Sequence, residues 1–186
     1  SEGTNVGMRY LDGAFNFDNS AAGDLITAGL AASIVWLDAY LTNPDRTARN
    51  PNLLIWNRKP WLIDHGAALY AHHDWASVDE ARMLTPFPLI RDHVLLGRAD
   101  DIEAADADLA SRLDADVLAS LLEQIPDSLL TVPAPGEPTV TAAGARTRYL
   151  TYLVTRLRAP RAFVAEAERA RVHGRSAPPR RLEARR

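Results

Sequence analysis

Residues 43–66 constrain the fold more than any other part of the sequence, because they combine a helix stop, a polar loop and two short apolar runs. Pro44 ends the helical pattern before it, since proline disfavours helical geometry in the residue that precedes it. Asp45 and Asn50 stand in the polar loop, and Asp64 follows the second apolar run. We therefore expect a helix, a loop and a hairpin to meet at three oxygen-bearing side chains.

The two apolar runs, Leu53–Asn57 and Trp61–Ile63, predict a hairpin because they are rich in the apolar and aromatic residues that strands favour. A polar turn between them would place Asp64 opposite Leu53. Asn50 would then lie three strand residues further along, roughly 10 Å at about 3.3 Å per residue. The hairpin is expected to bring Asn50 and Asp64 to one end.

These residue types suit phosphoryl transfer. That reaction needs a carboxylate to orient the attacking hydroxyl, and oxygen ligands for the magnesium that bridges the nucleotide phosphates. Asp45 can supply the carboxylate, and Asn50 and Asp64 can supply the ligands. An isolated loop aspartate is more often simply solvated, so the interpretation depends on all three residues together.

The spacing resembles that of the protein-kinase-like superfamily, and most of all the bacterial HipA-like kinases. The pattern D-R-x-x-x-N over Asp45–Asn50, followed by D-H-G over Asp64–Gly66, is similar to the catalytic loop and metal loop of that superfamily. The sequence departs from the pattern at Thr47, where histidine is common, and at His65, where phenylalanine is common. Both departures leave the metal ligands intact.

The resemblance implies a kinase C-terminal lobe that is mainly α-helical with a small β-hairpin, and α+β if an N-terminal lobe is included. It also implies transfer of the γ-phosphate of ATP, with Mg²⁺, to a Ser/Thr hydroxyl of a protein. Asp45 would be catalytic, Asn50 and Asp64 would bind the metal, and these two with Arg46 would bind the cofactor. A lipid or small-molecule kinase, or a non-catalytic pseudokinase or binding module, remains the alternative.

Lys59 is the only lysine in the sequence. A protein kinase holds the nucleotide phosphates with a lysine on an N-terminal-lobe strand and a loop that covers them. Lys59 is expected in the hairpin turn, away from Asp64, and residues 1–42 are too few for a five-stranded lobe. We therefore expect a chain that is inactive without the N-terminal lobe of its parent, which would be a partner.

Three segments are expected along the chain. Residues 1–22 would form an arm with aromatic anchors, residues 23–173 the helical lobe, and residues 174–186 a flexible basic tail. Arg46 could pair with a phosphate or clamp the loop through a nearby carboxylate, because a guanidinium suits either.

The sequence indicates where two helices within the lobe begin, end or break. Asp24 is expected to cap a helix that runs to about Thr42, with apolar residues three or four apart. A longer helical pattern covers residues 141–173, and Pro160 is expected to kink or split it.

Composition limits the compartment and the partners. The 186 residues predict one domain, and the absence of cysteine is compatible with a cytoplasmic location. The most apolar helix pattern, residues 25–41, contains Asp38 and fits a core helix better than a membrane span. The arginine-rich end, from Arg146 onward, could attract nucleic acid or an acidic protein surface, although helical arginines are more often solvated or paired.

Overall fold

The computed structural model describes residues 7–18, 20, 23–131 and 139–176. These residues form a mainly α-helical body with a small three-stranded antiparallel sheet, in the order β1-β2-β3. The coarse prediction of a helical fold with a small β-hairpin is therefore confirmed. Within the described residues, no helix is both long enough and apolar enough to cross a membrane.

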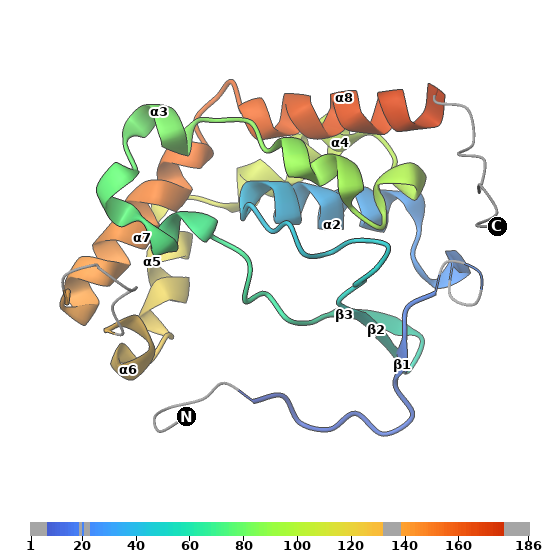
Figure 1. The fold of residues 1–186 in the computed structure, drawn as a ribbon, viewed down its shortest axis with the longest axis horizontal. Helices are drawn as coiled ribbons and strands as arrows, with labels where there is room; N and C mark the ends of the chain where they lie inside the picture. Colours follow the sequence, from blue (N-terminus) through green and yellow to red (C-terminus); the bar gives the residue numbers. More distant parts are fainter. Residues whose placement is uncertain (1–6, 19, 21–22, 132–138, 177–186) are drawn as a thin grey trace, which may run out of the picture.

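The strands are β1 (Phe15–Asn16), β2 (Leu53–Trp56) and β3 (Lys59–Leu62). The α-helices are α2 (Ala28–Tyr40), α3 (Glu80–Met83), α4 (Ile102–Leu109), α5 (Ala115–Glu123), α6 (Asp127–Leu130), α7 (Ala142–Arg156) and α8 (Ala162–Ser176). Short 3₁₀ helices cover Gly23–Leu25, Tyr70–His73, Trp75–Ser77, Pro88–Asp92, Leu96–Arg98 and Ala110–Arg112. Figure 1 shows α2 at the centre, with α4 and α8 on one side and the sheet on the other, while α3, α5 and α6 gather around α7.

Helix α2 begins at a threonine cap. The Thr27 side chain accepts a hydrogen bond from the Leu30 backbone N–H at 3.2 Å, which satisfies one of the unpaired donors of the first turn. The prediction that Asp24 caps this helix is wrong, because Asp24 lies in the preceding 3₁₀ turn. Trp36 and Tyr40 of α2 are almost completely buried and stack with their ring centroids 5.2 Å apart. Helix α2 therefore contributes two large aromatic side chains to the hydrophobic core.

The hairpin turn lies one residue earlier than the sequence predicts. Asn57 and Arg58 both have positive φ angles, 49° and 60°, as a two-residue type I′ turn requires. This turn pairs Leu53 with Leu62, so the prediction that Asp64 lies opposite Leu53 is wrong by two residues. The observed register moves Asp64 past the end of the ladder, toward the loop that precedes β2.

The N-terminal arm adds an edge strand. Phe15 pairs with β2, and the backbone N–H of Phe17 donates to the carbonyl of Leu53 at 2.9 Å. Phe17 is buried, whereas Met8 and Tyr10 are 56% and 86% exposed. Phe17 is therefore the aromatic residue of the arm that enters the core.

The C-terminal helical pattern is divided as predicted. Helix α7 ends at Arg156 and α8 begins at Ala162, on either side of Pro160. Helix α8 continues to Ser176, so it extends three residues beyond the predicted helical end at His173. Residues 177–186, the remainder of the predicted tail, lie outside the described residues.

Many arginines of this C-terminal part are bound within the protein. The Arg161 guanidinium contacts the Asp106 carboxylate at 2.7 Å, and Arg171 pairs with Glu168. Arg156 is buried and donates to the backbone carbonyls of Tyr40 at 2.9 Å and Ala39 at 3.1 Å. These arginines stabilise the helical body.

Candidate active site

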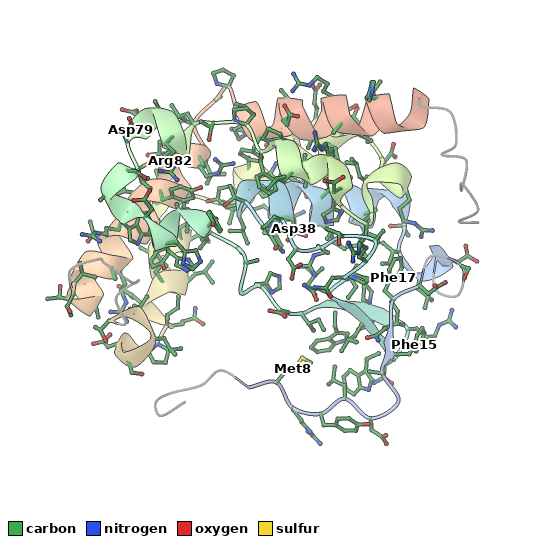
Figure 2. All side chains as sticks on the ribbon, in the orientation of Figure 1. Met8, Phe15, Phe17, Asp38, Asp79 and Arg82 are labelled. Carbon is green, nitrogen blue, oxygen red and sulfur yellow. The ribbon has the colours of Figure 1, made fainter. Side chains whose placement is uncertain are left out.

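A buried aspartate, Asp38 on α2, holds the loop that follows this helix. Its side chain has no exposed area and accepts hydrogen bonds from Asn43 Nδ2 at 2.9 Å and Arg46 Nε at 2.5 Å. His93 Nε2 lies 2.9 Å from the same carboxylate. In Figure 2, Asp38 lies on the side of α2 that faces the sheet. One carboxylate therefore joins α2, the loop and the segment around His93.

The Asp38 carboxylate is charged at neutral pH. Burial alone would raise the pKa of Asp38, but hydrogen bonds from His93 and Arg46, together with the charge of Arg46, bring it below the usual aspartate value of 3.8. A charged carboxylate is the form that pairs with a guanidinium, so the anchor stays intact across the neutral range.

The His93 ring has a defined hydrogen-bonding pattern. Its Nδ1 accepts from the backbone N–H of Leu95 at 3.1 Å, so the proton of the neutral ring is on Nε2, which donates to Asp38. The neighbouring Val94 N–H donates to the carbonyl of Arg46 at 3.0 Å. Thr47 and His93 form an isolated antiparallel bridge, so the segment around His93 also holds the loop through its backbone.

Arg46 is a structural clamp. The residue is 1% exposed, and its guanidinium contacts Asp38, the carbonyl of Asn52 and, at 3.1 Å, His65 Nε2. The prediction that Arg46 binds the cofactor is not supported by this position, because the buried guanidinium has no accessible face for a phosphate. Of the two roles weighed from the sequence, the structure favours the clamp through a nearby carboxylate.

Asp45 and Asn50 are brought together as the sequence predicts. The Asp45 Oδ2 accepts hydrogen bonds from Asn50 Nδ2 at 2.9 Å and from Asn52 Nδ2 at 3.0 Å. The Asp45 backbone N–H also donates to Asn43 Oδ1 at 3.2 Å. Both side-chain bonds reach the same oxygen, so within the described part of the chain Oδ1 remains available to a hydroxyl.

The amide of Asn50 has a fixed direction. A carboxylate accepts hydrogen bonds and does not donate them, so the Asn50 nitrogen faces Asp45 and its Oδ1 faces away. The loop closes on itself through Thr47, whose N–H donates to the Asn50 carbonyl at 2.9 Å. Asn50 is exposed, and it therefore presents an oxygen ligand at the protein surface.

Asp64 lies where β3 leaves the sheet. It has a φ of 49°, and both of its neighbours contact the loop region: the Ile63 N–H donates to the Asn52 carbonyl at 3.0 Å, and His65 meets Arg46. Among the described residues, the Asp64 carboxylate accepts from the Gly66 N–H at 3.4 Å and has no direct bond to Asp45. The structure therefore ties the Asp64 backbone to the loop and leaves the carboxylate exposed.

The oxygen donors suit a metal that shares its ligands with phosphate. Mg²⁺ is usually bound through one or two carboxylates together with water and substrate phosphates. Asn50 Oδ1 and the Asp64 carboxylate are oxygen donors of this chemical type, and among the described residues no hydrogen bond joins them. In residues 7–18, 20, 23–131 and 139–176, no group of three or more His, Cys, Asp or Glu side chains is arranged to hold a metal ion.

Three supporting residues have no site role in the sequence analysis. Asp38 has a detectable signal, which is a charge inside an apolar helix, whereas Asn52 stands among turn residues and His93 is 55 residues away from Asp38.

Comparisons with protein-family models, curated proteins and solved structures find no match to this chain.

Proposed function

We propose that this chain is the C-terminal lobe of a phosphotransferase of the protein-kinase-like class. The observation that carries the proposal is the 2.9 Å pairing of Asp45 with Asn50 on a loop anchored by the buried Asp38. Within that class, the residues over Asp45–Asn50 and Asp64–Gly66 are most similar to those of HipA-like kinases. The acceptor is proposed to be a Ser/Thr hydroxyl of a protein.

Asp45 orients the acceptor hydroxyl in this proposal. Asn50 and Asn52 hold Oδ2, so the carboxylate cannot rotate freely and Oδ1 is directed to the substrate. Phosphoryl transfer depends mainly on positioning and on electrostatic stabilisation, so a carboxylate fixed by two amides suits the reaction. Oδ1 accepts the hydroxyl proton as the oxygen attacks.

Asn50 and Asp64 are the proposed metal ligands. When bound, Mg²⁺-ATP supplies the γ-phosphoryl group and the cation that neutralises the developing charge. The Asn50 oxygen faces away from Asp45, and the exposed Asp64 follows Ile63, whose backbone N–H donates to the carbonyl of Asn52. Arg46 supports both residues from inside the protein.

The nucleotide phosphates also need a cation that Lys59 does not provide. Lys59 is the first residue of β3, at the opposite end of the hairpin from Asp64. We propose that a lysine-bearing N-terminal lobe of the parent protein completes the ATP site. A pseudokinase would keep the fold without turnover, but the presence of Asp45, Asn50 and Asp64 together favours an enzyme.

Asp45→Asn in the parent protein, with its lysine-bearing lobe, tests the proposal. General base catalysis contributes about 10²- to 10⁴-fold, so ATP-dependent phosphorylation should fall by that order while the thermal unfolding midpoint stays close to that of the parent. Asp108→Asn is the matched control, since Asp108 is an exposed aspartate on α4 that should not affect transfer. Equal phosphorylation by the Asp45→Asn variant and the parent would reject the role of Asp45.

A further inference from the structure

A pocket lies where α3 packs beside α7 (Figure 1), and it shares no residue with the candidate active site. Its volume is about 400 Å³, within the range of about 300–1,000 Å³ that is usual for small-molecule sites. Its lining residues are Trp75, Ala76, Val78, Met83, Thr147, Arg148 and Thr151. We call it the Arg148 pocket.

Arg148 differs from the other two arginines of α7 in its partners. Arg146 pairs with the Asp127 carboxylate at 2.7 Å, and the buried Arg156 donates to backbone carbonyls. Arg148 is half-buried at the pocket, and its guanidinium has no hydrogen-bond or ion-pair partner in the described part of the chain. A partly desolvated charge gains from an opposite charge, so this position favours an anionic ligand group.

Trp75 provides a second donor without an acceptor. The indole N–H of Trp36 donates to Asp106 at 2.7 Å, and that of Trp56 donates to a backbone carbonyl at 2.9 Å. The Trp75 ring packs edge-on against Tyr149, with ring centroids 5.1 Å apart, and its N–H has no acceptor among residues that the structure describes. A partly buried tryptophan usually finds a partner for this group. Two lining residues of one pocket therefore carry donors that a ligand could use.

The other walls of the Arg148 pocket favour a compact apolar group. Val78 and Met83 are partly buried and pack against the hydrophobic core. The Thr147 hydroxyl already donates to the carbonyl of Ala143 at 3.0 Å. None of these described lining residues belongs to a strand, so the walls present no sheet edge to which a peptide backbone could add. The lining therefore suits a small molecule better than an extended peptide.

We propose that the Arg148 pocket binds a small carboxylic acid whose remaining part is apolar. Arg148 holds the carboxylate through two parallel hydrogen bonds, because a planar guanidinium matches the two carboxylate oxygens. The Trp75 N–H supplies a further donor, and Val78 and Met83 cover the apolar part of the ligand. This site goes beyond the proposed phosphotransferase function, and its occupancy can be measured without ATP or turnover.

The test is an NMR titration of the ¹⁵N-labelled chain with phenylacetate at neutral pH. Phenylacetamide has a similar shape without the charge, and acetate has the charge without the apolar ring. Phenylacetate should shift the indole signal of Trp75 and the amide signals of Arg148 and Thr151, and bind about tenfold more tightly than either comparison compound. Equal affinity for phenylacetate and phenylacetamide, equal affinity for phenylacetate and acetate, or shifts elsewhere only would overturn the inference.

Arg148→Gln removes the charge and should weaken phenylacetate binding about tenfold, with the affinity for phenylacetamide unchanged. The thermal unfolding midpoint should stay close to that of the unchanged chain, because no described residue depends on the Arg148 guanidinium. Arg58→Gln is the matched control, since Arg58 is an exposed arginine of the hairpin turn, outside the pocket lining. Equal losses of phenylacetate affinity in the two variants would contradict a site at Arg148.

Two further measurements test the second donor and the kind of ligand. Trp75→Phe keeps an aromatic ring and removes the N–H, so the affinity for phenylacetate should fall, and an unchanged affinity would overturn the role of this donor. The dipeptide acetyl-Ala-Phe presents the same benzyl group and a carboxylate at a chain end. It should bind more weakly than phenylacetate, and tighter binding of the dipeptide would assign the pocket to a protein C-terminus and overturn the small-acid assignment.

Discussion

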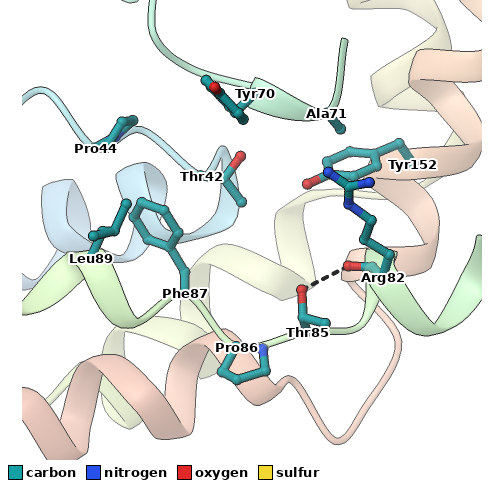
Figure 3. Close-up of a pocket in the computed structure, with 10 residues that line it drawn as sticks. All are labelled: Thr42, Pro44, Tyr70, Ala71, Arg82, Thr85, Pro86, Phe87, Leu89 and Tyr152. Atoms are coloured by element: carbon teal, nitrogen blue, oxygen red, sulfur yellow. Dashed lines mark hydrogen bonds between the residues drawn. The ribbon is translucent and has the colours of Figure 1, made fainter. Parts of the chain in front are cut away.

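The loop over residues 43–52 and the pocket segment over residues 67–89 lie side by side, but they are stabilised in different ways. The loop is held from within by a fully buried ion pair between Asp38 and Arg46. The pocket segment contains short helices, and the exposed side chain of Tyr70 lies on its surface. The two segments share a pocket (Figure 3) lined in part by Thr42, whose buried hydroxyl has no hydrogen-bond partner among the described residues.

This difference separates a loop with a buried ionic support from a segment whose apolar side chains reach the surface. A reacting carboxylate gains from fixed geometry, because positioning supplies much of the rate in phosphoryl transfer. The pocket segment instead exposes apolar side chains such as Tyr70, which is 62% exposed. Substitutions that remove each support in turn test this difference.

The largest expected effect comes from Asp38→Ala. The substitution leaves Arg46 buried without its carboxylate, and breaking one partner of a buried pair costs about 3–5 kcal/mol. Denaturant unfolding followed by circular dichroism measures the change. Asp108→Ala, which removes an exposed partner of Arg112, should cost less than about 1 kcal/mol. Similar losses in the two variants would show that the loop is not anchored through Asp38.

A smaller effect is expected from Asn52→Gly. Asn52 has a φ of 45°, which glycine adopts without strain, so the substitution removes mainly the hydrogen bonds to Asp45. Each bond contributes about 0.5–1.5 kcal/mol, and phosphate transfer should fall about tenfold as Asp45 loses orientation. Asn57→Gly is the control, since Asn57 has a φ of 49° in the exposed turn. Equal transfer by both variants would remove Asn52 from the positioning of Asp45.

The smallest effect concerns pH. Burial and the charge of Arg46 lower the pKa of His65 below 6.5, so the unfolded chain takes up this proton before the folded chain does. Stability should therefore decline as pH falls below 6.5 toward the folded-state pKa, and the slope should be shallower in His65→Gln. Chemical unfolding at a series of pH values measures it. An unchanged slope in His65→Gln would contradict this titration.

The parts of the fold that depend on neighbouring residues could be predicted from the sequence. Pro44 predicts the end of a helix near Thr42, close to the observed end at Tyr40, and two runs of apolar and aromatic residues predict the hairpin, because both signals act over a few positions. The sequence does not give the correct register of the hairpin, because Arg58 adopts a positive φ in the turn and no glycine marks that position. Thr27, and not Asp24, caps α2. Both residue types cap helices well, so the sequence alone does not decide between them.

Only the loop residues of the site, Asp45 and Asn50, could be predicted to pair from the sequence. Asp45 and Asn50 stand five residues apart and meet through a local loop, so their pairing followed from spacing. The buried support beneath the loop depends on His93, which contacts Asp38 from 55 residues further along the chain. No local sequence pattern indicates such a contact. Fixing the loop from two distant segments is a property of the tertiary structure.

The central claim is that Asn50 and Asp64 bind one metal ion beside Asp45. Mn²⁺ added with ATP to the ¹⁵N-labelled parent protein measures this directly, because a paramagnetic ion broadens nearby amide signals. We predict loss of the Asn50 and Asp64 signals, with Asp108 as an unaffected reference, and recovery of the Asn50 signal in Asp64→Ala. Broadening that leaves Asn50 and Asp64 intact, or that is unchanged in Asp64→Ala, would contradict the account.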